Sequence, residues 1–100
     1  MKTVTICGSM RYAAQMQRIA LDLELRRRFS VLQCMYNPDG LALTPEDVQA
    51  LSRAHMRKID LSDAIYVVDI DGYMGQSVTE EIAYALERGK EIIFDSEFMK

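Results

Sequence analysis

An unbroken apolar run late in the chain most constrains the fold. Within residues 64–70, the four hydrophobic residues Ile65-Tyr66-Val67-Val68 follow one another without interruption. A strand that is apolar on both faces is typical of a parallel sheet covered by helices on both sides. We therefore expect this segment to be the central strand. Shorter apolar runs that fit the same sheet cover residues 3–7, 31–36 and 91–94.

Helical patterns separate these strands. A stripe of apolar residues at helical spacing begins after Ser9, and a second helix is predicted from Thr44-Pro45-Glu46-Asp47, a hydroxyl cap followed by proline and acidic residues. A third helix is predicted to start at a capping box, Ser77-Val78-Thr79-Glu80, and to end at Gly89. The order βαβαβαβ predicts an α/β fold, a small Rossmann-like or flavodoxin-like three-layer sandwich with a parallel sheet of about four strands. At 100 residues, the chain is expected to be a single domain, residues 1–100.

Composition excludes several classes of partner. The formal net charge of −3 lacks the basic excess on which binding to polymeric nucleic acid depends, and no apolar run is long enough for a membrane span. Cys7 and Cys34 lie in apolar stretches without a Cys-x-x-Cys spacing, so we expect buried thiols and no metal. The apolar segment before Gly8 is too short for a secretory leader, which predicts a cytoplasmic protein. Because a domain of this size has a modest core, we expect a homodimer or larger homo-oligomer.

The loop after the first strand is the first candidate for a ligand site, because parallel sheets bind ligands beyond the carboxyl ends of their strands. It reads Gly8-Ser9-Met10-Arg11 at the start of a helix. Backbone N–H groups, a hydroxyl and a guanidinium suit an anion such as a monophosphate, while a helix cap and a solvated arginine explain the same residues. The Walker and dinucleotide glycine patterns are absent, and Arg11 follows Cys7 too closely for a phosphatase loop.

The loop after the predicted central strand concentrates acidic groups. Its carboxylates are Asp69, Asp71, Glu80 and Glu81, with Gly72, Gly75 and Ser77 leaving room for a ligand. Paired carboxylates in such a crevice suit glycosyl transfer, although a capping box explains Glu80 and the helix dipole favours acidic residues in a first turn. An Asp-x-Asp magnesium site lacks a phosphate-cradling loop beside it, so no metal is expected. The single histidine, His55, lies on the apolar stripe of the second helix, where a structural role is favoured over a catalytic one.

Three motifs together resemble the nucleoside 2-deoxyribosyltransferase superfamily. They are residues 8–11 (Gly-Ser-Met-Arg), 60–68 (Asp-Leu-Ser-Asp-Ala-Ile-Tyr-Val-Val) and 75–85 (Gly-Gln-Ser-Val-Thr-Glu-Glu-Ile-Ala-Tyr-Ala). The Gly-Ser-x-Arg opening is closer to the 2′-deoxynucleoside 5′-phosphate N-hydrolase branch. The resemblance implies that Glu81 attacks C1′ of a deoxyribose, expels the base and forms a glycosyl-enzyme, which water hydrolyses or a second base intercepts.

The same resemblance implies the other roles in the site, with no cofactor. Asp69 or Asp71 orients the sugar or the nucleophile, and the residues around Arg11, Ser9, Gly75 and Ser77 hold a 5′-phosphate or 5′-hydroxyl of a small nucleoside or nucleotide. The family usually has an aspartate where this sequence has His55. A histidine can transfer a proton to the leaving base but cannot be a second carboxylate. This departure favours the alternative function, a nucleotide-binding or sensing module without catalysis.

Overall fold

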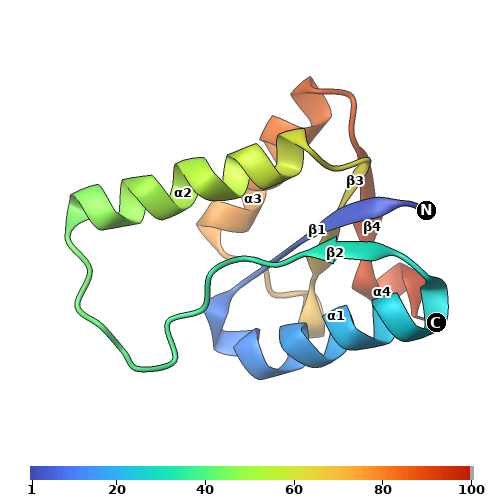
Figure 1. Cartoon of the computed structure of the whole chain (residues 1–100), viewed down its shortest axis with the longest axis horizontal. Coiled ribbons are helices and arrows are strands. Elements are labelled where there is room, and N and C mark those ends of the chain that lie inside the picture. Colours follow the sequence, from blue (N-terminus) through green and yellow to red (C-terminus); the bar gives the residue numbers. More distant parts are fainter. Residues whose placement is uncertain (100) are drawn as a thin grey trace.

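The computed structural model describes residues 1–99, which form one parallel sheet between helices (Figure 1). The strands are β1 (Thr3–Gly8), β2 (Ser30–Leu32), β3 (Ala64–Val68) and β4 (Glu91–Phe94), and the α-helices are α1 (Ala13–Arg27), α2 (Pro45–Asp60), α3 (Gln76–Glu87) and α4 (Asp95–Phe98). Two 3-10 turns, η1 (Met10–Tyr12) and η2 (Ile70–Gly72), follow β1 and β3. The strand order is β2-β1-β3-β4, and every neighbouring pair is parallel. The predicted Rossmann-like or flavodoxin-like α/β fold is therefore confirmed.

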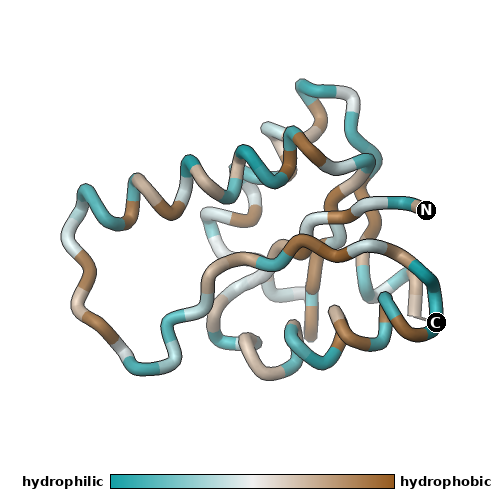
Figure 2. The backbone as a smooth tube through the Cα atoms, viewed as in Figure 1, coloured by the Kyte–Doolittle hydropathy of each residue, from teal (hydrophilic) through white to brown (hydrophobic). Residues whose placement is uncertain are grey.

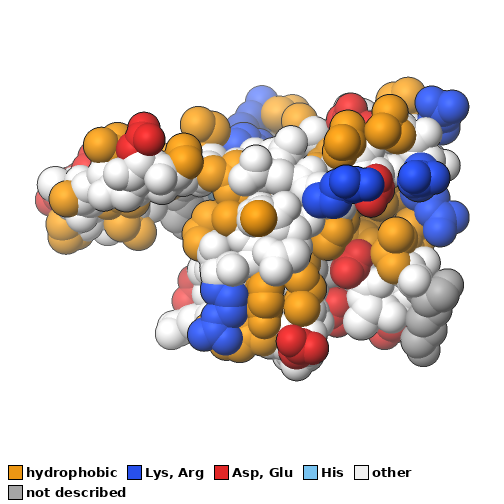
Figure 3. Space-filling view, turned by 90° about the horizontal axis from the view of Figure 1, so that it is seen from below, with side chains coloured by type: hydrophobic (Ala, Val, Ile, Leu, Met, Phe, Trp, Pro, Cys, Tyr) orange, Lys and Arg blue, Asp and Glu red, His pale blue; other side chains and the backbone are white. Residues whose placement is uncertain are grey.

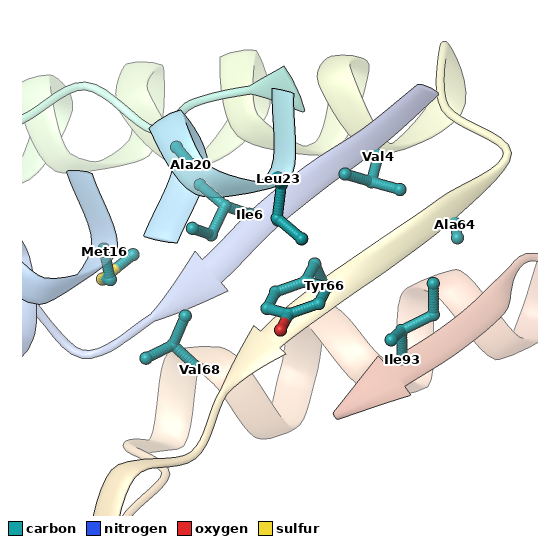
Figure 4. Close-up of a cluster of buried hydrophobic side chains, with 9 residues drawn as sticks. All are labelled: Val4, Ile6, Met16, Ala20, Leu23, Ala64, Tyr66, Val68 and Ile93. Carbon is teal, nitrogen blue, oxygen red and sulfur yellow. The ribbon is translucent and has the colours of Figure 1, made fainter. Parts of the chain in front are cut away.

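Alternate residues of β3 build two separate cores. Tyr66 and Val68 face α1 and α4 in a cluster that includes Met16 and Leu23 (Figure 4). Ile65 and Val67 point to the opposite face, and pack with the following residues from β1, α2 and α3: Cys7, Ile59, Val78 and Ala85. All residues of β3 are buried, and the strand lies between β1 and β4. The prediction that this segment is a central strand with two covered faces is confirmed.

The helix starts show where local sequence was sufficient. Thr44 caps α2 as predicted: the Asp47 N–H donates to Thr44 Oγ1 at 3.1 Å, and the Thr44 N–H donates to Asp47 Oδ2 at 3.0 Å. The predicted capping box of the third helix is wrong. α3 begins at Gln76 with Gly75 as its N-cap, so Ser77 lies in the first turn and no side chain caps this end.

Two further expectations need correction. The second strand is shorter than the apolar run that predicted it, because β2 ends at Leu32 and residues 33–36 continue without strand pairing. Cys34, in this irregular segment, is partly exposed instead of buried. α4 follows β4 directly and was not predicted. Its start is held by Asp69, whose carboxylate accepts hydrogen bonds from the N–H and hydroxyl of Ser96 at 2.9 and 2.6 Å.

Residues 37–54, the loop before α2 and the first turns of that helix, form an exposed arm beyond the sheet (Figure 1). Every residue of the arm is exposed. The tube in Figure 2 shows hydrophobic positions both in its loop and along its helix, and the left end of Figure 3 shows hydrophobic side chains among polar and acidic ones. Its large apolar side chains are Leu41, Leu43, Val48 and Leu51. Among the helices described, none has the length and apolar character needed to cross a membrane.

Candidate functional site

The candidate site is a pocket at the carboxyl end of β1, between α2 and α3 and beside the segment that follows β2. β2 lies on one side of β1 and β3 on the other, so the strand order reverses at β1. Parallel α/β sheets bind ligands beyond the carboxyl ends of their strands at such a reversal. The pocket has a volume of about 330 Å³, within the range of about 300–1,000 Å³ usual for small-molecule sites. It is lined by Gly8, Ser9, Met10, Cys34, Met35, Val48, Leu51, Ser52, His55, Lys58, Gly75, Ser77 and Glu81.

A junction of Cys7, His55 and Glu81 forms the polar end of this pocket. His55 Nε2 lies 3.4 Å from Cys7 Sγ and 3.4 Å from Glu81 Oε1. The three side chains come from β1, α2 and α3. The Cys7 sulfur, a ring nitrogen of His55 and a carboxylate oxygen of Glu81 all lie within 4.8 Å of one another. Cys7 is 1% exposed, and the side chains of His55 and Glu81 retain 10% and 15% of their exposure. Glu81 is therefore the member of the junction that a ligand can reach most easily.

The junction does not have the geometry of a cysteine–histidine–carboxylate triad. In a triad, the nucleophile and the carboxylate contact opposite nitrogens of the histidine ring. Here Cys7 and Glu81 both face Nε2, and within residues 1–99 the buried Nδ1 has no hydrogen-bond partner. Burial, reinforced by the negative charge of Glu81, also raises the pKa of the Cys7 thiol well above its usual value. These observations agree with the sequence argument against Cys7 as a nucleophile.

Of the predicted catalytic residues, the structure brings Glu81 and His55 together and leaves the two aspartates elsewhere. Asp69 uses both carboxylate oxygens to hold Ser96 at the start of α4, and it does not line the pocket. Asp71 is exposed in η2 with a left-handed backbone (φ 54°) and is likewise outside the lining. Among the described residues that line the pocket, Glu81 is the one carboxylate.

The predicted anion-binding residues divide in the same way. Gly8, Ser9, Met10, Gly75 and Ser77 line the pocket. Because Gly75 is the N-cap of α3, the Ser77 hydroxyl is not used as a cap and can bind a ligand. No side chain caps the first turn of α3, which has N–H groups without partners in the helix.

Arg11 is the exception among the predicted anion-binding residues. Its guanidinium stacks 3.9 Å above the ring of Tyr73, and it does not line the pocket. The backbone N–H of Arg11 donates to Ser9 Oγ at 3.2 Å, so this hydroxyl already serves as the cap of η1.

Gly8 is required by close packing at the pocket floor. A Cβ at this position would lie 2.9 Å from Met16 Sδ and 3.2 Å from Val68 Cβ. The absence of a side chain lets α1 and β3 approach β1 where the pocket begins. The glycine of the Gly-Ser-Met-Arg loop therefore has a packing role in addition to any contact with a ligand.

Sequence reasoning missed three polar groups of the lining, Ser52, Lys58 and Cys34. Lys58 follows His55 by one helical turn and so shares its face of α2, which helical spacing shows once His55 is placed in a site. Its Nζ donates to the Gln33 carbonyl at 2.7 Å and ties α2 to the segment after β2. Cys34 lies in that irregular segment, where the sequence contains no periodic signal.

No protein-family model matches the chain, and no curated protein matches it.

Proposed function

We propose that the protein cleaves or transfers the N-glycosidic bond of a nucleoside or nucleotide, with Glu81 as the nucleophile. The carboxylate attacks C1′ of the sugar, the bond to the base breaks, and the electron pair leaves with the base nitrogen, which takes up a proton. Water that attacks C1′ completes hydrolysis, and a second base that attacks it completes transfer; both release the carboxylate. The reaction needs no cofactor.

The observation that carries this proposal is the position of Glu81. Its carboxylate lies at the buried end of a pocket whose remaining polar groups include Ser9 and Ser77 at two helix starts. A sugar between these ends would meet the carboxylate at C1′ and the N–H and hydroxyl groups at its 5′ substituent. His55 Nε2 lies 3.4 Å from Oε1 and can orient the nucleophile, and His55 as proton donor to the leaving base belongs to the same proposal.

The test is chromatography of free base released from a mixed pool of deoxynucleosides and their 5′-monophosphates. Glu81→Gln should lower the rate by on the order of a thousandfold or more, because it removes the nucleophile and keeps the side-chain shape. The matched control is Glu80→Gln, which changes the preceding, exposed carboxylate on the same helix and should leave the rate unchanged. Equal rates for the native protein and Glu81→Gln would remove Glu81 from the mechanism.

A nucleotide-binding module without catalysis is the second candidate, and the surroundings of Glu81 favour it. Within the described lining no other carboxylate joins Glu81, and Asp69 is held by Ser96. A binding module would release no base from any substrate in the pool. It would still melt at a higher temperature with an intact nucleoside monophosphate, since a ligand that binds only the folded state stabilises it.

We also propose that the protein works as a homodimer or larger homo-oligomer. The exposed arm carries large apolar side chains that stay 39–68% exposed, and two of them, Val48 and Leu51, also line the pocket. A second copy that covered this arm would remove apolar surface from water and narrow the pocket opening.

A further inference from the structure

We propose that Cys7, His55 and Glu81 form a binding site for a single zinc ion. The three residues are far apart in the sequence, and the packing of β1, α2 and α3 brings the sulfur, a ring nitrogen and a carboxylate oxygen to within 4.8 Å of one another. His55 and Glu81 border the pocket, so a fourth coordination position faces it. The site takes its ligands from tertiary structure and has no short sequence motif.

The two separations measured from His55 fit zinc coordination. Zinc lies about 2.3 Å from sulfur and about 2.0–2.2 Å from nitrogen or oxygen, which in a tetrahedron separates ligand atoms by about 3.3–3.6 Å. His55 Nε2 is 3.4 Å from both Cys7 Sγ and Glu81 Oε1. The ligand set is also selective, because magnesium and calcium prefer oxygen alone, whereas zinc accepts sulfur, nitrogen and oxygen together.

Hydrogen bonding leaves the junction incompletely satisfied. The Cys7 thiol has one hydrogen for three acceptors: His55 Nε2 at 3.4 Å, the Thr5 carbonyl at 3.8 Å and the Glu81 carboxylate. His55 Nε2 also lies 3.4 Å from Glu81 Oε1. When the Cys7 thiol releases its proton to solvent and the hydrogen of His55 is on Nδ1, a cation between the three atoms accepts a lone pair from each of them at once.

The charge of the junction points the same way. Within residues 1–99, Glu81 forms an ion-pair contact with His55 and with no lysine or arginine. The nearby Lys58 donates its Nζ hydrogen to the Gln33 carbonyl instead. A largely buried carboxylate without a permanent positive partner is costly, and a divalent ion would supply that partner.

Zinc in this site would occupy the carboxylate that the proposed function uses as its nucleophile. This consequence rests on the proposed function: metal-free protein should release base, and zinc-loaded protein should release it at least tenfold more slowly. The binding site itself does not depend on the reaction, so it is tested by a spectrum that needs no substrate.

The experiment adds Co²⁺ to the metal-free protein and then displaces it with Zn²⁺. We expect one equivalent of Co²⁺ to give a thiolate-to-cobalt charge-transfer band and the intense visible bands of four-coordinate cobalt, both removed by Zn²⁺. Cys7→Ser should abolish the charge-transfer band. Cys34→Ser, which removes the other thiol beside the pocket, should keep it.

Glu81→Gln and His55→Ala extend the test in case Cys7→Ser fails to fold. Altering residues that only orient metal ligands lowers affinity by about 10–100-fold, so losing a ligand should weaken Zn²⁺ binding by at least about tenfold. Absence of the charge-transfer band from the native protein would overturn the site, as would a band that survives Cys7→Ser and disappears in Cys34→Ser. If neither metal-free nor zinc-loaded protein releases base, the proposed function fails, and the cobalt spectrum still decides the metal site.

Discussion

The two halves of α2 have similar sequence patterns and opposite surroundings. In the second half, Ile59 is fully buried against β3, and His55 is 8% exposed at the pocket. In the first half, Val48 and Leu51 continue the same helical stripe but are 54% and 39% exposed. The sheet ends beneath the middle of the helix, and the arm extends beyond it (Figure 1).

This difference shows that an apolar stripe predicts a buried face without saying what buries it. Residues 45–54 satisfy the periodicity of a packed helix, although all of them are exposed in the described part of the chain. The pocket lies at the boundary between the halves, with Gly8 and Glu81 on its packed side and Val48 and Leu51 on its open side. The predictions below test whether the two halves differ in stability and in role.

The largest effect is expected from truncation on the packed side. Ile59→Ala should lower the free energy of unfolding by about 2–5 kcal/mol, because it opens a cavity in a fully buried cluster. Leu51→Ala, the matched change in the open half, should cost no more than about 0.5 kcal/mol. Urea denaturation of both variants measures the difference, and equal losses would show that the two halves are packed alike in solution.

The next effect is expected at the pocket floor. Gly8→Ala should destabilise the fold by about 1–3 kcal/mol, since the new methyl meets Met16 and the backbone-bound Cβ of Val68. Thermal unfolding provides the measurement. Ser52→Ala, which changes an exposed lining residue on the open side, is the control and should unfold as the native protein does.

Local signals were sufficient for features that depend on neighbouring residues. The Thr44-Pro45 start of α2, the left-handed Gly89 after α3 and the apolar β3 all follow from a few consecutive side chains. The start of α3 failed because Gly75 provides the cap without a side chain, which a search for hydroxyl and acidic residues overlooks.

The candidate site could be predicted only in part. The carboxyl ends of parallel strands meet at one edge of the sheet, which was enough to place Gly8 and Glu81 in one crevice. The contact of Cys7 with His55 could not be predicted, because it depends on where α2 lies along the sheet. Asp69 was misleading for a similar reason: its partner, Ser96, lies on a short helix that the sequence did not indicate.

A smaller effect is expected at the free end of the arm. Thr44→Ala removes the reciprocal cap with Asp47 and should weaken the first turns of α2 by about 0.5–2 kcal/mol. Because these turns are not packed on the core, the global free energy of unfolding should change by less than about 0.5 kcal/mol. Hydrogen exchange should accelerate at residues 46–50 and stay unchanged in β1 and β3. Acceleration throughout the sheet would contradict the separation of the two halves.

The smallest change in monomer stability is expected from Leu51→Asp, which nevertheless tests the role of the arm most directly. A charge on an exposed helix position should alter the unfolding free energy by no more than about 0.5 kcal/mol, but it cannot be buried unpaired in a subunit interface without a large penalty. Analytical ultracentrifugation should therefore show an oligomer for the native protein and a monomer for the variant. Leu21→Asp introduces the same charge at an exposed leucine on α1, away from the arm, and should leave the assembly intact. An oligomer that survives Leu51→Asp would mean that the apolar stripe of the arm serves the pocket alone, and that the open half of α2 is a ligand-binding surface instead of an interface.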